Sequence, residues 1–335
     1  MTSKIRIGTV GLGLMGSSIA TCILAAGHAV TSLIKEIDTA DEARERILGY
    51  LRQLTQEGLL IDTPETIIER LTITDDVSLL SNHTVVIESI TENIDEKKSL
   101  YQRLETVLSP TAIIGSNTSA IPVSVLQSGL KHPERLLGIH WAEPAHITRF
   151  MEVICGKDSD LTYAYEIVAL AESWGKEPSL LKKDIRGFIT NRIMYAMLRE
   201  SFNLVENGYA TIEDVDRSLR NDLGYWITFA GPFRFMDLTG IPAYLTVMKD
   251  LFPDLSNNTK SPKLMEDLVA SGAKGYRMRR VFILTRPNRL KCGKRNSSTS
   301  AMTSGNSPKN IYPLPSKRPN DTHSIYKGHR SNCTG

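Results

Sequence analysis

The feature that most constrains the fold is a glycine-rich turn near the N-terminus, Gly11-Leu-Gly13-Leu-Met-Gly16. It follows a short, β-rich apolar run at residues 4–10 and precedes a helical pattern at residues 17–26. In that context the motif is typical of a turn that binds the pyrophosphate of a dinucleotide. Gly11 permits the tight turn, Gly13 lets the phosphates approach the backbone, and Gly16 lets the helix pack closely, while the helix N-terminus supplies amides. The alternative is that these glycines serve packing alone.

A second predicted strand, at residues 29–34, should end near an acidic residue that binds the adenosine ribose. Glu36 lies 20 residues after Gly16, which is the spacing that the glycine motif predicts. We therefore predict NAD as the cofactor. NADP is the alternative, because Lys35 beside Glu36 is equally suited to attract a 2′-phosphate. The charged, amphipathic residues 41–58 should form a helix over the core.

Two further buried strands are predicted to end in polar residues. Residues 85–90 run into Glu92 and then into a helix that carries Lys97, and open α/β sheets bind ligands beyond the carboxyl ends of their strands. For Lys97 the alternative is a surface ion pair with a residue four positions away. Residues 112–115 open into Ser116-Asn117-Thr118-Ser119, which either cap the next helix or present polar groups to a substrate oxygen.

The stretch from Leu137 to Ile154 predicts two strands joined by a turn that contains proline. His140 would end the first strand and Glu152 would lie in the second. A carboxylate beside an imidazole fixes its tautomer and stabilises the imidazolium, so this pair would make a workable general base. The alternative is a partly buried structural histidine beside a glutamate on an edge strand.

Composition limits the classes of protein that remain. A chain of 335 residues, 41% of them hydrophobic, is long enough for two domains. Its four cysteines lack metal-ligand spacing and disulfide density, which predicts a reducing, cytoplasmic setting without a signal peptide. No apolar run approaches the roughly 18 residues that a membrane span needs. Before residue 277 the net charge is −9, from 27 Lys and Arg and 36 Asp and Glu, so we expect no nucleic-acid partner for this part.

Together these motifs resemble the L-3-hydroxyacyl-CoA dehydrogenase family, including the 3-hydroxybutyryl-CoA dehydrogenases, over residues 4 to about 276. Two downstream motifs add to the resemblance: Gly187-Phe-Ile-Thr-Asn191-Arg192 and Gly224-Tyr-Trp-Ile-Thr-Phe-Ala-Gly231-Pro232-Phe233. The resemblance implies an α/β Rossmann-type NAD-binding domain at residues 1–183. An all-helical domain, for dimerisation and for the substrate, would follow at residues 184–276.

The resemblance also implies the reaction and the site. A homodimer would catalyse reversible, NAD-dependent oxidation of an (S)-3-hydroxyacyl-CoA to the 3-ketoacyl-CoA in fatty-acid metabolism, with no metal and no membrane partner. His140 would be the catalytic base and Glu152 its partner, while Ser119 and Asn191 would hold the substrate oxygen and the nicotinamide. The residues implied to bind the cofactor are Gly11, Gly13, Leu14, Met15, Gly16, Glu36, Glu92, Lys97 and Asn117.

Two positions depart from the family's pattern. Glu143 stands where the family usually has an asparagine, which bears on which substrate the site accepts. When the glycines are aligned, Ile34 falls at the family's aspartate position, so Glu36 would serve only with a bulge in the strand. Two other hypotheses are a folded but inactive NAD-binding protein and a β-hydroxyacid dehydrogenase of the 3-hydroxyisobutyrate type. The latter uses a lysine base on the long helix after its first domain, where this chain has Asn191 and Arg192.

The remainder of the chain divides into helices and a tail. A helix at residues 161–174 and a strand at residues 177–181 should close the first domain. Residues 185–207 predict one long helix, apolar on most faces and therefore buried, between two subunits. Further helices are predicted over three ranges: 212–219, 232–239 and 243–251.

Residues 277–335 are basic, rich in Ser, Asn and Pro, and without apolar periodicity, which predicts disorder. A frameshift is our preferred interpretation, with a nucleic-acid or membrane-binding arm as the alternative. In the frame that begins on each codon's third base, residues 281–287 can encode Gly-Phe-Tyr-Ser-Tyr-Thr-Pro, a string that the family would place there.

Overall fold

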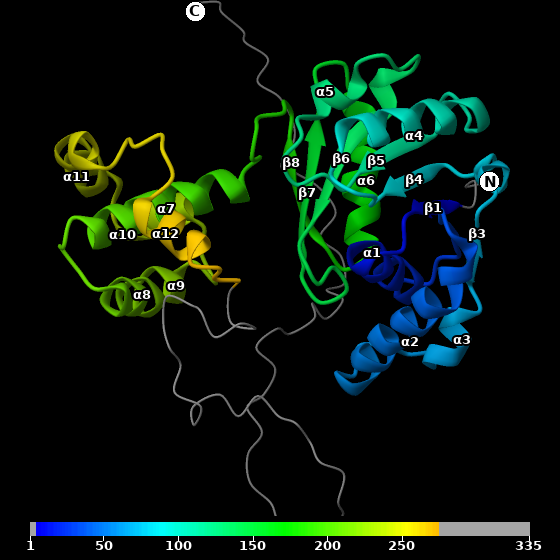
Figure 1. Ribbon diagram of the computed structural model, residues 1–335, viewed down its shortest axis with the longest axis horizontal. Helices are drawn as coiled ribbons and strands as arrows, with labels where there is room; N and C mark the ends of the chain where they lie inside the picture. Colours follow the sequence, from blue (N-terminus) through cyan, green and yellow to red (C-terminus); the bar gives the residue numbers. More distant parts are fainter. Residues whose placement is uncertain (1–4, 275–335) are drawn as a thin grey trace, which may run out of the picture. The chain divides into compact units, whose positions relative to one another are not determined.

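A computed structural model describes residues 5–274, which comprise an α/β part and a helical part (Figure 1). The α/β part contains an eight-stranded sheet in the order β3-β2-β1-β4-β5-β6-β7-β8. Strands β1 to β6 are parallel, β7 is antiparallel to β6, and β8 is parallel to β7. The order β3-β2-β1-β4-β5-β6 is that of doubly wound dinucleotide-binding sheets. The strands are β1 (Ile7–Val10), β2 (Val30–Leu33), β3 (Leu71–Thr74), β4 (Val85–Glu88), β5 (Ile113–Ser116), β6 (Leu136–Trp141), β7 (Phe150–Cys155) and β8 (Glu177–Leu181).

Helices cover both faces of this sheet, so its central strands β1 and β4 are buried throughout and do not alternate between buried and exposed residues. One face packs against α1 (Leu14–Ala25), α2 (Ala40–Gln56), α3 (Pro64–Ile68) and α6 (Leu161–Ser173). The other face packs against α4 (Ile94–Val107) and α5 (Val123–Gln127). Each face has its own cluster of buried apolar side chains, and the carboxyl ends of β1, β4, β5 and β6 meet at one edge.

The helical part confirms the predicted fold class. It contains α7 (Thr190–Glu206), α8 (Ile212–Asn221), α9 (Leu223–Trp226), α10 (Pro232–Thr239), α11 (Ile241–Leu251) and α12 (Lys263–Ala270). The prediction that the long helix begins at residue 185 is wrong. Gly187 has a φ of 84° and Phe188 has a φ of 50°, and right-handed helix cannot continue through two left-handed residues. None of the α7 residues is buried within the chain, and the predicted burial of this helix between two subunits stays a prediction.

Other predicted elements agree closely with the structure. The strand at residues 177–181 and the helix at residues 232–239 are confirmed to the residue. The sequence analysis missed four elements: β3, α3, α9 and α12. The domain limits 1–183 and 184–276 stay predictions, and the tail predicted at residues 277–335 lies outside the described residues.

The bulge that Glu36 would require is absent from the described strands. Strand β2 pairs residue by residue with β1 and with β3, and the Ile34 amide continues the pattern by donating to the Thr74 carbonyl. Within residues 5–274, no helix is long and apolar enough to cross a membrane. The same residues contain no group of three His, Cys, Asp or Glu side chains that could hold a metal ion.

Candidate active site

The glycine turn after β1 has the geometry that a bound dinucleotide requires. Gly11 has a φ of 88°, and a Cβ on Gly16 would lie 1.9 Å from the Gly11 carbonyl oxygen, so the helix can approach the turn only without a side chain there. A Cβ on Gly13 would meet no atom within 4 Å, which leaves open space above the backbone. No side chain caps α1 and no acidic residue lies in its first turn, so its N-terminal amides are available to phosphate groups.

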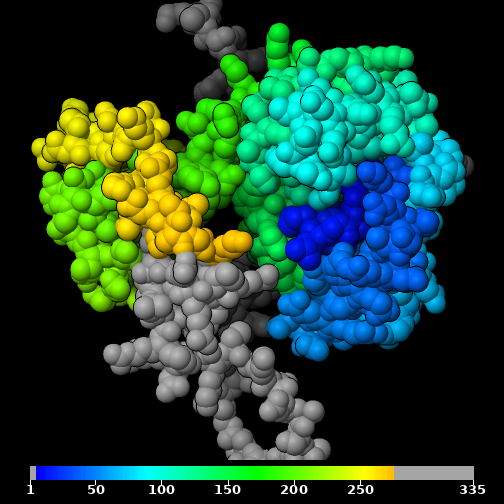
Figure 2. Space-filling view, in the orientation of Figure 1, coloured from blue at the N-terminus to red at the C-terminus, as the bar shows by residue number. Residues whose placement is uncertain are grey.

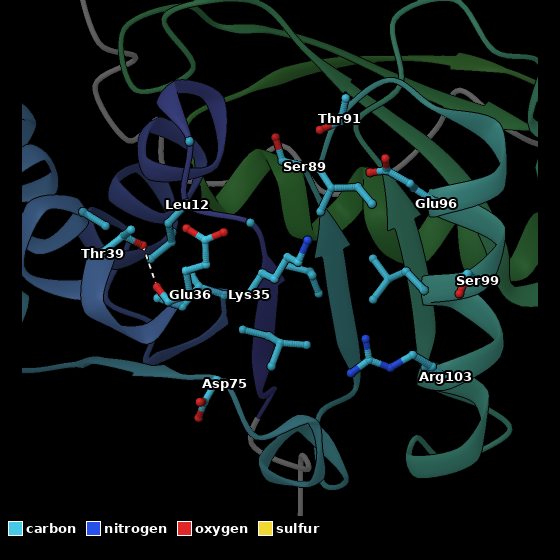
Figure 3. Close-up of a pocket in the computed structure, with 18 of the residues that line it drawn as sticks. Leu12, Lys35, Glu36, Thr39, Asp75, Ser89, Thr91, Glu96, Ser99 and Arg103 are labelled. Carbon is cyan, nitrogen blue, oxygen red and sulfur yellow. Dashed lines mark hydrogen bonds between the residues drawn. The ribbon is translucent and has the colours of Figure 1, made fainter.

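A cleft of about 1310 Å³ extends from this turn between α2 and α4 (Figure 3). Leu12 and Gly13 form part of its wall, whereas Leu14 is 61% exposed and does not line it. Met15 packs partly against the core. Lys35 and Glu36 both line the cleft, while Ile34 is buried in the wall. The Glu36 carboxylate is therefore exposed to the cleft although strand β2 contains no bulge.

A buried ionic cluster lies at the end of β4. Glu88 is fully buried and accepts hydrogen bonds from Lys97 Nζ at 2.6 Å, Tyr101 Oη at 2.5 Å and Ser116 Oγ at 2.9 Å. Burial and the charge of Glu88 raise the pKa of Tyr101 well above its ordinary value. Lys97 is 1% exposed, so the alternative of a surface ion pair is wrong. The signal for this cluster was present in the sequence as a single carboxylate that ends an otherwise apolar strand.

Lys97 also connects this cluster to Glu92, with 3.3 Å between Nζ and Oε2. The other oxygen of Glu92 accepts hydrogen bonds from Thr118 Oγ1 at 2.6 Å and from the Ser119 amide at 3.0 Å. Burial would raise the pKa of Glu92, but the hydrogen bonds from Thr118, Lys97 and Ser119 and the charge of Lys97 hold it below its ordinary value. Glu92 thus fixes the turn that presents Ser119.

The four polar residues after β5 have separate contacts. Ser116 faces Glu88 and Thr118 faces Glu92, whereas Asn117 accepts from the Trp141 amide at 3.0 Å and donates to Ser89 Oγ at 3.3 Å. Helix α5 has no side-chain cap, so the alternative that these residues cap it is wrong. The Ser119 side chain remains exposed.

His140 and Glu152 lie opposite each other in the predicted hairpin of β6 and β7, which the structure confirms. His140 Nδ1 lies 2.9 Å from Glu152 Oε2, and both residues are buried. Phe150 and Phe188 pack against the imidazole, with ring centroids 5.5 and 5.6 Å away. Among the described residues, none forms a hydrogen bond with Nε2.

The second oxygen of Glu152 is held from the helical part of the chain. Its Oε1 accepts from the amides of Ile189 and Thr190, each at 3.0 Å, where α7 begins. Burial would raise the pKa of Glu152, but its hydrogen bonds with His140, Thr190 and Ile189 and the charge of His140 together lower it. An ionised Glu152 accepts a hydrogen bond from Nδ1–H, which keeps that proton on Nδ1 and leaves Nε2 as the basic nitrogen.

Asn191 follows directly, and its side-chain amide donates to the Ser119 carbonyl at 3.1 Å. Both residues line a second cavity of about 830 Å³, together with seven others: Ala120, Arg186, Gly187, Arg192, Tyr195, Ala196 and Arg199. The three arginines of this cavity were missed by the sequence analysis. No local pattern singles them out, because only the turn at Gly187 brings Arg186 to the same side as α7.

The remaining polar residues of the hairpin turn away from this site. His146 Nδ1 lies 2.7 Å from Ser18 Oγ, and its ring stacks on Tyr50 at 4.3 Å between centroids. It therefore packs against α1 and α2 as a structural residue. Glu143 is exposed and precedes a cis proline.

The doubly wound sheet, the glycine turn and the open cleft define a dinucleotide-binding protein. Comparison with protein families agrees. The model of the 3-hydroxyacyl-CoA dehydrogenase NAD-binding domain matches residues 6–185, and that of the C-terminal domain matches residues 187–283. The chain belongs to the 3-hydroxyacyl-CoA dehydrogenase family, which confirms the resemblance seen in its motifs.

Two relatives and one solved structure illustrate the range of the family. The chain is 35% identical to a 5-formyl-3-hydroxy-2-methylpyridine 4-carboxylate 5-dehydrogenase of Mesorhizobium japonicum, over 79% of this chain and 86% of the relative. It is 30% identical to a probable 3-hydroxybutyryl-CoA dehydrogenase of Deinococcus radiodurans, over 81% and 96%. A crystal structure of the former kind of enzyme, described as an NAD⁺-dependent dismutase, has a TM-score of 0.76 at 30% identity and covers 84% of this chain and 92% of that one.

Proposed function

We propose that this protein oxidises the 3-hydroxyl of an (S)-3-hydroxyacyl-CoA, reversibly, with NAD. The observation that carries the proposal is the enclosed His140–Glu152 pair at the carboxyl edge of the sheet. Ligands of open α/β sheets bind at this edge, so the imidazole faces the end of the cofactor that reacts. A bound NAD would supply the hydride acceptor, and the protein would need to supply only a base and a polar clamp.

In this mechanism His140 removes the proton of the substrate hydroxyl with Nε2. Glu152 keeps the proton on Nδ1 and stabilises the imidazolium that results. Because the α7 amides and His140 occupy both carboxylate oxygens, the pair is oriented before substrate arrives. Ser119 and Asn191 would hold the substrate oxygen and the nicotinamide ring, and their mutual hydrogen bond fixes their separation.

The cofactor would lie along the glycine turn, with Glu36 accepting hydrogen bonds from the adenosine ribose. We place Glu92 and Asn117 near the other ribose, at the ends of β4 and β5. Lys97 is enclosed, so we assign it an indirect effect through Glu92. The proposed roles of Leu14 and Met15 are limited to their backbone amides at the start of α1, because neither lines the cleft.

We further propose a homodimer formed by the helical part. Its helices expose large apolar side chains, among them Ile193, Phe233, Leu238 and Val269, at 63, 79, 65 and 61%. Figure 2 shows α11 and α12 at the surface, in yellow and orange. Exposed apolar surface on this scale marks an interaction site, and a second copy would cover it.

A second candidate function is the oxidation or dismutation of a small aromatic aldehyde that carries a carboxylate. The observation that favours it is the 35% identity to the Mesorhizobium japonicum enzyme named above. That substrate class lacks coenzyme A, so the two functions differ in whether a thioester is needed.

The experiment is a steady-state assay of the full chain with NADH and either acetoacetyl-CoA or 5-formyl-3-hydroxy-2-methylpyridine 4-carboxylate. We expect NADH oxidation with acetoacetyl-CoA, at a kcat/KM at least tenfold above that for the pyridine aldehyde. The reverse order would reject the acyl-CoA function and favour the second candidate. Absence of turnover with both, alongside NADH binding, would reject both.

A further inference from the structure

We infer that the cavity beside Ser119 and Asn191 is an anion subsite, which takes a carboxylate or phosphate group that the substrate carries. The inference rests on the proposed function, since it places this group on the substrate of the same reaction. It starts from the charge of the cavity wall: Arg186, Arg192 and Arg199 line it, and no Asp or Glu among residues 5–274 does.

The two cavities differ sharply in this respect. The cofactor cleft is lined by both acidic and basic side chains, and Glu36 lies beside Lys35 (Figure 3). Arg46 of that cleft is already paired with Glu42 at 2.6 Å. A wall of mixed charge suits a part of a ligand that has no net charge, whereas a wall whose charged residues are all cations favours an anion.

The three guanidinium groups are also not neutralised from behind. Among residues 5–274, none of them forms an ion pair, and Arg192 only donates to the Arg186 carbonyl at 3.3 Å. The nearest acid in sequence, Asp184, is occupied by the amide and hydroxyl of Ser124, at 2.7 and 3.0 Å. Three uncompensated positive charges around one space repel each other, and a bound anion would relieve that repulsion.

Two elements bring these charges together: helix α7 and the turn at Gly187 that precedes it. Arg192, Tyr195 and Arg199 are spaced three and four residues apart on α7, so they share one face of the helix. The left-handed turn at Gly187 brings Arg186 to the same cavity. A guanidinium is a planar fork that binds carboxylate and phosphate through two parallel hydrogen bonds, and Tyr195 adds a hydroxyl group.

The location of the cavity indicates which ligand carries the anionic group. Ser119 and Asn191 belong to the same wall, and the cofactor phosphates have their own site at Gly11–Gly16. The group that reaches the arginines is therefore part of the substrate. Its source is either a carboxylate on the substrate skeleton or a phosphate of coenzyme A.

The test compares three ketones in NADH-dependent reduction by the full chain: acetoacetate, acetoacetyl-CoA and the uncharged thioester acetoacetyl-pantetheine. Each of Arg186→Gln, Arg192→Gln and Arg199→Gln should raise KM for an anionic ketone about tenfold more than KM for acetoacetyl-pantetheine, as expected for one lost charge-assisted hydrogen bond. An effect on acetoacetate alone identifies a carboxylate, and an effect on acetoacetyl-CoA alone identifies a phosphate. Arg220→Gln, on α8 and outside both cavities, is the matched control.

Equal changes for the charged and uncharged ketones, or none, would overturn the subsite. If no thioester is reduced at all, the proposed function fails but the subsite is still tested by binding. Calorimetric titration of the NADH-loaded chain with acetate and with inorganic phosphate should then show binding that weakens about tenfold in the Arg192→Gln variant. Equal affinity of the parent chain and this variant would reject the subsite.

Discussion

The α/β part of this chain buries its large apolar side chains, whereas the helical part exposes many of them. In the sheet part, side chains such as Ile7, Ile47 and Tyr101 are completely enclosed between strands and helices. Beyond residue 188, only Val215 and Ala230 are buried apolar residues among those described. A layered sheet closes its own core, whereas a set of short helices needs a further surface to cover its apolar faces. The contrast fits the proposed dimer, in which a second copy would cover the exposed apolar faces of the helical part.

The largest effect is expected from breaking the buried ion pair of the sheet part. Lys97→Met leaves Glu88 charged and enclosed, which should lower the free energy of unfolding by about 3–5 kcal/mol. The matched variant is Lys263→Met on α12, whose partner Asp267 lies 2.8 Å away but is exposed to solvent. It should cause no measurable change, because exposed pairs contribute little. Urea denaturation measures the free energy of unfolding of both variants. Equal losses would contradict the expected difference between the buried and the exposed ion pair.

His146 provides the next largest effect, through pH. Burial and the charge of Lys176 lower the pKa of His146 to about 4. Between pH 6.5 and 4 the unfolded chain binds a proton that the folded chain excludes, so stability should decrease as pH falls, by at most about 3 kcal/mol. His146→Asn should remove this part of the slope between pH 7 and 5 in urea titrations. His132→Asn, at a partly exposed position, is the control, and an unchanged slope in His146→Asn would contradict the account.

The helical part should respond through association and not through its own core. Phe233 is 79% exposed, so Phe233→Ser removes little packing within the described part of the chain. Loss of an aromatic anchor at an interface costs about 2 kcal/mol, which would weaken dimerisation roughly 30-fold. Sedimentation equilibrium of the full chain measures this constant. A monomeric parent protein, or a variant that dimerises equally well, would break the comparison between the two parts.

The smallest expected effect concerns the cofactor cleft of the sheet part. Glu36→Gln removes a charged acceptor for the adenosine ribose, and we expect KM for NADH to rise about tenfold. The preference for NADH over NADPH should narrow, because Lys35 would then stand without an adjacent acid. Kinetics with both cofactors test this, and an unchanged preference would show that Glu36 does not contact the ribose.

The sequence predicted those features that depend on local pattern. The glycine turn, the order of strand and helix, and the pairing of His140 with Glu152 follow from spacing and hairpin geometry. Features that depend on distant packing were not accessible. The predicted start of α7 was wrong because Phe188 adopts a left-handed conformation, and the only hint of this in the sequence is the preceding Gly187. Lys97 was left ambiguous because its burial is decided by Glu88, nine positions earlier and on another element.

The site combines both kinds of information. Glu152 receives His140 from its own hairpin, which the sequence indicates, and two α7 amides from 37 and 38 positions away, which it does not. The arginine cavity is of the second kind, since its charges converge only once α7 is placed beside the turn at Ser119.

The most direct test of the central claim is the turnover number of His140→Gln. If Nε2 of His140 is the base, NADH-dependent reduction of acetoacetyl-CoA should fall at least about 100-fold, and in Glu152→Gln about tenfold or more, with NADH affinity unchanged in both. Turnover of His140→Gln within a factor of about three of the parent enzyme would contradict the account and show that another group moves the proton.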